Sequence, residues 1–326
     1  MSSLRYVASH KLVCHSDAIV TIDFHQDGRY IAAGGLDNKL SVWNVDEGSL
    51  EVIVTAPSPL LCVQWSATKS YFLVAGLEDG HIIFMTMDNV ILITGFKGHD
   101  VPVECVAQRG ALLATGSFRE VRVWEVDDKY RSHEIGLPPT NGWNRESEVL
   151  VTSVHWKDES TLLVSYMHHG ILIWDAVRDQ LVTSISISTA IGSTSLSPSG
   201  RYLAVSNIRS GFDVYDLQTN SPVRSYRHTT GKDLPVPVLF VHEGFAIMGG
   251  SGSGEVDVWD ASSLISTRHS WRTDQLQAQY RASSDVFLIA TGMAKVGKDN
   301  YIQLWRSKET RRSCFTSLFV PLINFV

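Results

Sequence analysis

Glycines alternate with serines in GGSGSGEVDVWD, residues 249–260, and this stretch is the first candidate for chemistry in the chain. Glycine-rich turns bind phosphate where bare backbone N–H groups point inward and form an anion nest. Such a site is completed by a helix N-terminus or by the Lys-Ser/Thr pair of a P-loop. An alternating strand follows here, and the pair is missing. We therefore predict that residues 249–254 form a hairpin turn rather than a nucleotide site.

Histidines and serines are the next candidates. His168, His169 and His155 suggest metal binding, but adjacent histidines in a turn point in different directions, and no acid or cysteine joins them at ligand spacing. The chain has no Gly-x-Ser-x-Gly nucleophile elbow. From the residues alone we expect no metal, no cofactor and no catalytic residue.

Composition sets broad limits on the class of protein. The chain has 326 residues, 44% of them hydrophobic and 19% charged, and a formal net charge of −6 with both signs mixed. These values predict a globular protein that does not use nucleic acid as its main partner. The cysteines have no CxxC pair, which fits reduced thiols: Cys14, Cys62, Cys105 and Cys314. The N-terminus lacks an apolar run of signal-peptide length, so we expect a cytoplasmic protein.

Seven stretches share one pattern: an apolar strand, a turn of small residues, and an alternating strand that ends in an aromatic residue. The aromatic anchors are Trp43, Phe84, Trp124, Trp174, Tyr215, Trp259 and Trp305. Their spacing of 40 to 50 residues is typical of propeller blades. One short strand precedes each hairpin, as in AIVTIDFH, and another follows it, as in LEVIVTA, so each unit holds four strands.

This pattern predicts an all-β fold, a closed seven-bladed β-propeller of four-stranded antiparallel blades. The last unit ends at Trp305 after three strands, while Leu4–Cys14 precedes the first unit without a partner. We therefore expect this N-terminal strand to close the last blade, because closure removes an exposed edge. Residues 1–306 form the propeller, and residues 307–326 are a basic, then apolar, tail.

The repeats resemble the WD-repeat family. The pairs Trp174-Asp175 and Trp259-Asp260 carry the resemblance, with Tyr215-Asp216 and Trp43-Asn44 as looser versions and Gly98-His99 ahead of the third unit. The resemblance covers residues 4 to 306. It implies a non-enzymatic scaffold that presents a rigid face of loops to one or more proteins, and we expect a monomeric propeller.

The resemblance also implies a structural hydrogen-bonded set of His, Ser or Thr, Asp and Trp in each blade. The first blade offers His15, Asp37 and Trp43, with Ala33 at the hydroxyl position. The third offers His99, Thr115 and Trp124, with Arg119-Glu120 where the Asp is expected. In the last blade, Asp299 lies six residues before Trp305.

Long connections are the candidates for partner binding. Asp127–Leu150 produces the longest spacing, and its Pro/Gly/Asn-rich part carries Trp143 and Arg145, residue types enriched in binding hot spots. Trp143 folding back to cap the disc is the alternative. HTTGKDLP (228–235) and AKVGKDN (294–300) should extend from the same face, and they add four candidates: His228, Lys232, Lys295 and Lys298.

Two alternatives stay open at this point. One is a propeller enzyme or small-ligand sensor that uses the central funnel; exported quinone- or calcium-dependent dehydrogenases are examples of such enzymes. The other is a membrane-tethered scaffold, because Arg311 and Arg312 precede the apolar run CFTSLFVPLINFV. That run is shorter than the roughly 20 residues that cross a bilayer, so membrane contact through residues 311–326 would be peripheral. Packing against the rim and partner binding are the other interpretations of this tail.

Overall fold

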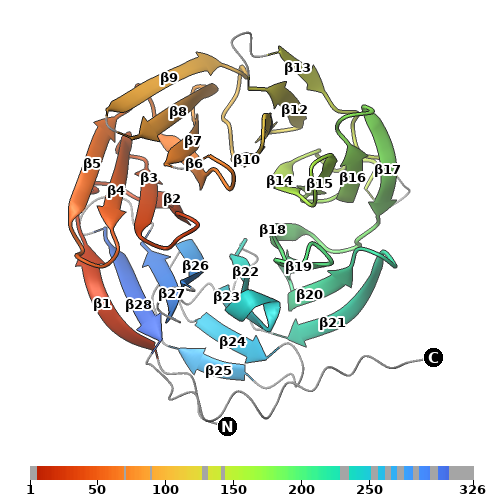
Figure 1. The fold of residues 1–326 in the computed structure, drawn as a ribbon. Coiled ribbons are helices and arrows are strands. Elements are labelled where there is room, and N and C mark those ends of the chain that lie inside the picture. The colour runs from red at the N-terminus through yellow and green to blue at the C-terminus, as the bar shows by residue number, and fades with distance from the viewer. Residues whose placement is uncertain are drawn as a thin grey trace.

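The structure is a computed structural model. It describes residues 6–69, 71–88, 90–126, 131–140, 144–227, 235–250, 256–260, 266–269, 275–281, 286–293 and 300–307. Figure 1 shows seven sheets arranged radially in a ring, each with its strands in order from the centre to the rim. The predicted seven-bladed propeller of four-stranded antiparallel blades is confirmed.

Each of the first four blades is a simple antiparallel meander. Blade 1 consists of β2 (Ile19–Phe24), β3 (Tyr30–Gly35), β4 (Lys39–Asn44) and β5 (Leu50–Thr55). Blade 2 consists of β6 (Leu60–Trp65), β7 (Phe72–Leu77), β8 (His81–Met87) and β9 (Ile91–Lys97). Blade 3 consists of β10 (Cys105–Arg109), β11 (Leu112–Ser117), β12 (Glu120–Glu125) and β13 (Arg131–Glu134). Blade 4 consists of β14 (Val151–Trp156), β15 (Thr161–Tyr166), β16 (Gly170–Asp175) and β17 (Gln180–Ile185).

The remaining blades complete the ring. Blade 5 consists of β18 (Ile191–Leu196), β19 (Tyr202–Asn207), β20 (Gly211–Asp216) and β21 (Ser221–Arg227). Blade 6 consists of β22 (Val238–Val241), β23 (Ala246–Gly250), β24 (Val256–Asp260) and β25 (Ser266–His269), with a short 3₁₀ turn η1 (His242–Gly244) after β22. Blade 7 takes β26 (Gln275–Arg281), β27 (Val286–Gly292) and β28 (Ile302–Ser307) from the C-terminal part and β1 (Tyr6–Leu12) from the N-terminal part.

The N-terminal strand closes the ring, as predicted. β1 pairs antiparallel with β28, and Figure 1 shows the red and blue strands side by side. The Gln303 amide donates to the His10 carbonyl at 2.9 Å. Arg306 of β28 donates to the Val45 carbonyl of blade 1 at 2.7 Å, so blade 7 is also joined to its neighbour.

The glycine- and serine-rich stretch at residues 249–254 connects the two strands of a hairpin, and its first two glycines already belong to a strand. Gly249 and Gly250 belong to β23, which pairs antiparallel with β24, and residues 251–255 lie outside the described part of the chain. A Cβ atom on Gly249 would lie 2.2 Å from the Phe212 ring of blade 5. This glycine therefore allows close packing between two blades.

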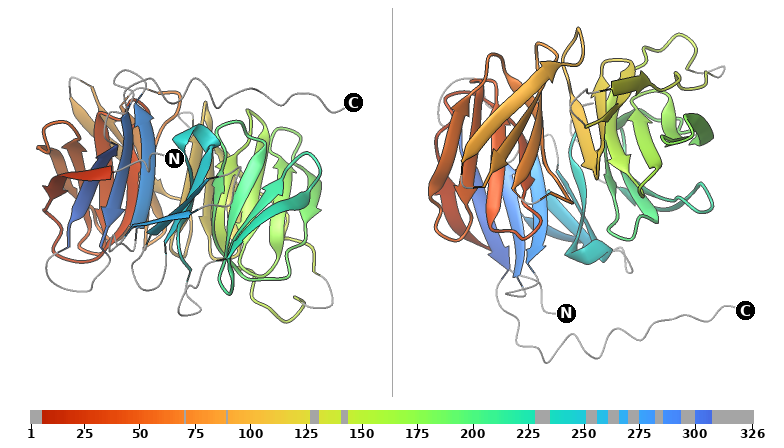
Figure 2. Two further views of the ribbon diagram at one scale, coloured as in Figure 1. Left: turned by 90° about the horizontal axis from the view of Figure 1, so that it is seen from below. Right: turned by 45° about the horizontal axis from the view of Figure 1, so that its top comes forward.

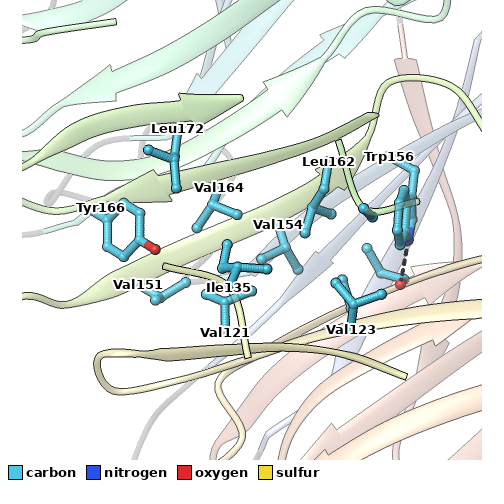
Figure 3. Packing of buried hydrophobic residues seen from close by; sticks show 13 residues of the cluster. Val121, Val123, Ile135, Val151, Val154, Trp156, Leu162, Val164, Tyr166 and Leu172 are labelled. Atoms are coloured by element: carbon cyan, nitrogen blue, oxygen red, sulfur yellow. Dashed lines mark hydrogen bonds between the residues drawn. The ribbon is translucent and has the colours of Figure 1, made fainter. Parts of the chain in front are cut away.

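Apolar side chains fill the space between successive blades. Figure 3 shows one such cluster, in which Val121 and Ile135 of blade 3 face Val154 and Val164 of blade 4. The Trp156 indole donates to the Ala107 carbonyl at 2.8 Å across the same interface. Because both faces of every blade are covered in this way, many strands are buried along most of their length.

Strand register corrects one predicted anchor. Trp43 lies opposite Ile31 and packs towards blade 7, and at the matching position of blade 2 it is Met85 that lies opposite Leu73. Met85 packs against blade 1, whereas Phe84 points to the other face and packs against blade 3. Side chains alternate along a strand, so a shift of one residue reverses the face. The anchor of blade 2 is therefore Met85, and Phe84 belongs to the next interface.

The innermost strands are joined by side chains that satisfy backbone N–H groups of the neighbouring blade. Asp23 accepts from the Trp65 N–H at 2.7 Å and from the Gln277 amide at 2.8 Å, which links three blades. Burial raises the pKa of Asp23 to about 7. Thr21, Gln64, Ser193 and Ser195 accept from the next blade in the same manner. These bonds account for edge donors that would otherwise be unpaired near the centre.

Candidate partner-binding face

One face of the disc carries the segments that precede each innermost strand and the turns between the second and third strands. We call it the loop face, and the opposite face the turn face. In an antiparallel meander, these two kinds of connection lie at the same end of the blade. Figure 2 (left) shows the long olive-green segment before β14 projecting from this face of the disc.

A hydrogen-bonded chain holds the loop face of blade 1. The His15 ring is 2.9 Å from Asp37 through Nδ1 and 2.9 Å from the Ser41 hydroxyl through Nε2. The Trp43 indole donates to Ser41 Oγ at 3.1 Å. Since a carboxylate only accepts, Nδ1 donates to Asp37, and Nε2 is then the acceptor for the Ser41 hydroxyl. The chain ties the segment before β2 to the turn after β3.

The hydroxyl of this set is Ser41, whereas the sequence had predicted it at position 33. Ala33 and Ser41 lie directly opposite each other on β3 and β4, and both are fully buried. Opposed residues of an antiparallel pair project to the same side of the sheet. The hydroxyl therefore lies on β4 instead of β3, and from there it still contacts His15 and Trp43. The signal was present in the sequence, two residues before Trp43.

Blade 3 builds the same set with a different acid. His99 lies 2.7 Å from the Thr115 hydroxyl and 3.2 Å from Glu120, and the Trp124 indole donates to Thr115 at 2.8 Å. Glu120 thus stands where Asp37 stands in blade 1, and it also lies 3.3 Å from the Arg122 guanidinium.

The anchors predicted in blades 4 to 7 differ in the partners that their side chains find. In blade 7 the Trp305 indole donates to Thr291 at 3.1 Å, while Asp299 lies outside the described residues. In blade 4 the Trp174 indole donates to Asp179, an exposed acid, and Asp175 pairs with Arg178 at 2.7 Å. Tyr215 of blade 5 and Trp259 of blade 6 are buried against the preceding blade, whereas Asp260 is exposed.

The pKa values of Asp37 and His99 are shifted by burial and by their hydrogen-bond partners. Burial works to raise the pKa of Asp37, but the hydrogen bonds from His15 and from the Ser16 N–H lower it overall. Burial lowers the pKa of His99, and the bond to Glu120 opposes this shift. Both groups have structural partners, so the sets position loops and leave no free nucleophile or base.

Backbone hydrogen bonds fix the loop face between blades as well. The N–H groups of Val151 and Ile191 donate to the Phe118 and Met167 carbonyls of the preceding blade at 2.8 and 2.9 Å. Within blade 4, the Met167 N–H donates to the Leu150 carbonyl at 2.8 Å. The turn at Met167 is therefore held by hydrogen bonds at both its N–H and its C=O group. Such a turn is ordered before a partner binds, so binding costs little conformational entropy.

The segment before β14 is held at several points and exposed between them. Ile135, Pro138 and Asn144 are buried, whereas Leu137 and Arg145 face solvent. Arg145 is therefore presented by an anchored segment. The other predicted contact residues lie outside the described residues: Trp143, His228, Lys232, Lys295 and Lys298.

Phe118 is an exposed loop-face aromatic that sequence reasoning did not single out. Its side chain is 43% exposed, and its φ of 52° lies in the left-handed region, where a bulky residue is strained. The Ser117 hydroxyl donates to the Val101 and Pro102 carbonyls, which brings the exposed Val101 close to this turn. Only two residues separate β11 from β12, against three between β3 and β4, and this shorter turn was the available signal.

The histidines considered for a metal site have other surroundings. The ring of His155 contacts Thr194, and burial lowers its pKa to about 4. Among the residues that the structure describes, no group of three or more His, Cys, Asp or Glu is placed to hold a metal ion. Over the same residues, no helix has the length and apolar character needed to cross a bilayer.

Comparisons with known proteins agree with this architecture. A family described as "WD domain, G-beta repeat" matches residues 7–44. The ribosome biogenesis protein WDR12 homologue of Drosophila mojavensis is 24% identical over 264 residues, covering 72% of this chain and 61% of that protein. The homologue of Drosophila yakuba is 25% identical over 264 residues, covering 72% and 60%. This chain therefore spans less than two thirds of the relatives it matches.

Proposed function

The chain belongs to the WD-repeat β-propeller family, and from this premise we propose that it is a non-enzymatic scaffold whose loop face binds other proteins. The observation that carries the proposal is the fixed geometry of this face around exposed side chains. Phe118 and Arg145 are exposed, while the backbone beside them is hydrogen-bonded or buried. Aromatic and arginine side chains on a rigid support are the residue types that dominate binding hot spots.

The relatives suggest a process for this activity. They are named as ribosome biogenesis proteins, and we propose that the partners of this chain act in the same process. The exclusion of nucleic acid, which was inferred from charge, and the cytoplasmic location, which was inferred from the N-terminus, stay predictions. Imaging a tagged full chain separates cytoplasmic from nuclear accumulation, and nuclear accumulation would correct the second prediction.

Affinity capture from native lysate tests the proposal. The full chain is compared with a Trp143→Ala/Arg145→Glu variant and with a turn-face control, Lys69→Glu, each chosen to melt at the wild-type temperature. We expect the loop-face variant to capture at least ten-fold less of each specific partner protein than the wild type does, while the control captures the wild-type amount. Equal capture by all three chains would refute the loop face as the binding surface.

A further inference from the structure

The outer strand of blade 2 presents a continuous apolar run to solvent. Val90, Ile91, Leu92 and Ile93 are 75%, 47%, 59% and 40% exposed. β9 is the last strand of its sheet and lies on the rim in Figure 1. Natural edge strands are normally protected by charge, proline or short length. Ile91–Phe96 contains no charged residue and no proline, so this edge lacks the usual protection.

Other outer strands show the contrast. β1, β5 and β21 carry Lys11, Glu51 and Arg224. β17 also lacks charge, but its two exposed apolar residues, Leu181 and Val182, are followed by threonine and serine. β9 therefore has the longest exposed apolar run among the outer strands whose side chains are described.

The backbone of β9 also has unused pairing capacity. The Met87 N–H donates to the Tyr71 carbonyl at 3.0 Å, which turns the Met87 backbone towards β7 and away from β9. Met87 lies opposite Ile91, and the direction of backbone groups alternates along an antiparallel ladder. The N–H and C=O groups of Ile91, Ile93 and Gly95 therefore point outward to the rim. They form a template for one more strand.

We propose that this protein forms a two-fold symmetric dimer in which the β9 strands of two copies pair antiparallel and join two blades into one sheet. A second copy is self-complementary here, because Ile91, Ile93 and Gly95 of each chain supply outward donors and acceptors to the other. Charge also favours this occupant. Asp88 precedes β9 and Lys97 ends it, both exposed, so antiparallel pairing brings the acidic end of one strand near the basic end of the other. A two-fold contact of this kind closes and does not propagate into fibres.

This inference departs from the monomer expected from the sequence. It is independent of the proposed function, because β9 lies on the rim and the loop face stays free in the dimer.

Sedimentation equilibrium of the purified full chain between about 1 and 100 μM tests the dimer. Leu92→Lys places a charge on the rim without touching the core, and Val182→Lys is the matched control on β17, where the replaced side chain is 57% exposed. We expect wild type and control to dimerise equally and Leu92→Lys to dimerise at least ten-fold more weakly, with all three chains melting alike. A monomeric wild type over the whole range overturns the proposal and leaves the edge to a strand of another protein.

Cysteine cross-linking tests the location. Pairing of Ile91 with Gly95 places Ile93 opposite Ile93 of the second copy, within the Cα distance that a disulfide spans. Ile93→Cys should therefore give a covalent dimer on mild oxidation, above the background of the native cysteines, and Val182→Cys should not. A wild-type dimer that neither weakens with Leu92→Lys nor cross-links through position 93 would place the interface elsewhere and overturn the assignment to β9.

Discussion

At the scale of single residues, Ser41 joins two buried polar groups. It lies between the His15 ring and the Trp43 indole in a site where all three side chains are buried. Removing the hydroxyl leaves a buried donor and a buried acceptor unsatisfied, and each such loss costs about 1–3 kcal/mol.

A double-mutant cycle measures this link. We expect Ser41→Ala to lower the free energy of unfolding by about 2–6 kcal/mol, because two buried groups lose a partner. Combined with Trp43→Phe it should show a coupling energy of about 0.5–2 kcal/mol, because both changes remove the same bond. Trp174→Phe is the control, since its indole bonds an exposed acid. Strict additivity of Ser41→Ala and Trp43→Phe in urea unfolding would disprove the link.

Phe118 should show opposite effects on stability and on binding. Glycine adopts a φ of 52° without the penalty of a side chain, so Phe118→Gly should leave stability unchanged or raise it by up to about 1 kcal/mol. The same variant should capture less partner, because the exposed ring is lost. Leu181→Gly on the rim controls for the loss of an exposed apolar side chain. Reduced stability with undiminished capture would show that Phe118 has a packing role only.

His155 should make stability depend on pH. Its pKa falls from the usual 6.5 to about 4 in the fold, so between these values the unfolded chain binds the extra proton. Stability therefore falls as pH falls through this window, by up to about 1.4 kcal/mol per pH unit. The raised pKa of Asp23 acts in the opposite direction but is shared by both chains compared. We therefore expect the free energy of unfolding of the wild type, measured relative to that of His155→Gln, to fall as pH falls from 6.5 to 4.5. A difference between the two chains that stays constant over this range would contradict a buried neutral ring.

At the scale of elements, β1 closes a ring whose blades all depend on both neighbours. Leu12 packs in a cluster with Ile302 and Leu304 of blade 7 and Ile19 of blade 1. Loss of β1 therefore exposes β28 and opens an interface as well.

Truncation measures the closure. Removal of residues 1–14 should lower the melting temperature by more than about 10 °C, because deletion of several buried contacts costs several kcal/mol. Removal of residues 1–5 alone keeps β1 and is the matched control. Similar melting of the two truncated chains would mean that β1 adds little to the ring.

The extent of prediction from sequence also differs by element. The repeat of about forty residues was sufficient to predict the number of blades. The closure could be predicted because the last repeat has three strands and the N-terminal strand has no partner in the first. The same double-sided burial made Phe84 and Met85 indistinguishable, since both are apolar and buried and only the register tells their faces apart. The move from Ala33 to Ser41 and the bridging role of Asp23 depend on cross-strand and cross-blade neighbours, which linear spacing does not contain. For the loop face, the sequence indicated Arg145 but not Phe118.

At the scale of the whole molecule, the propeller places the loop face and the exposed edge of β9 on different parts of its surface. The loop face is fixed by buried sets and by backbone bonds between blades, while the rim at β9 offers an open strand. A dimer joined at β9 would present two loop faces at once, which raises the effective concentration of a second contact.

The most direct test of the scaffold account is site-specific photo-cross-linking of the full chain in native lysate. A photoreactive residue is placed at Phe118 or Arg145 on the loop face, and at Lys69 or Ser199 on the turn face, in chains that melt like the wild type. We expect specific protein adducts from the loop-face positions, lost on competition with unlabelled wild-type chain, and few from the turn-face positions. Adducts that form only from the turn face, or none that the unlabelled chain displaces, would contradict the account.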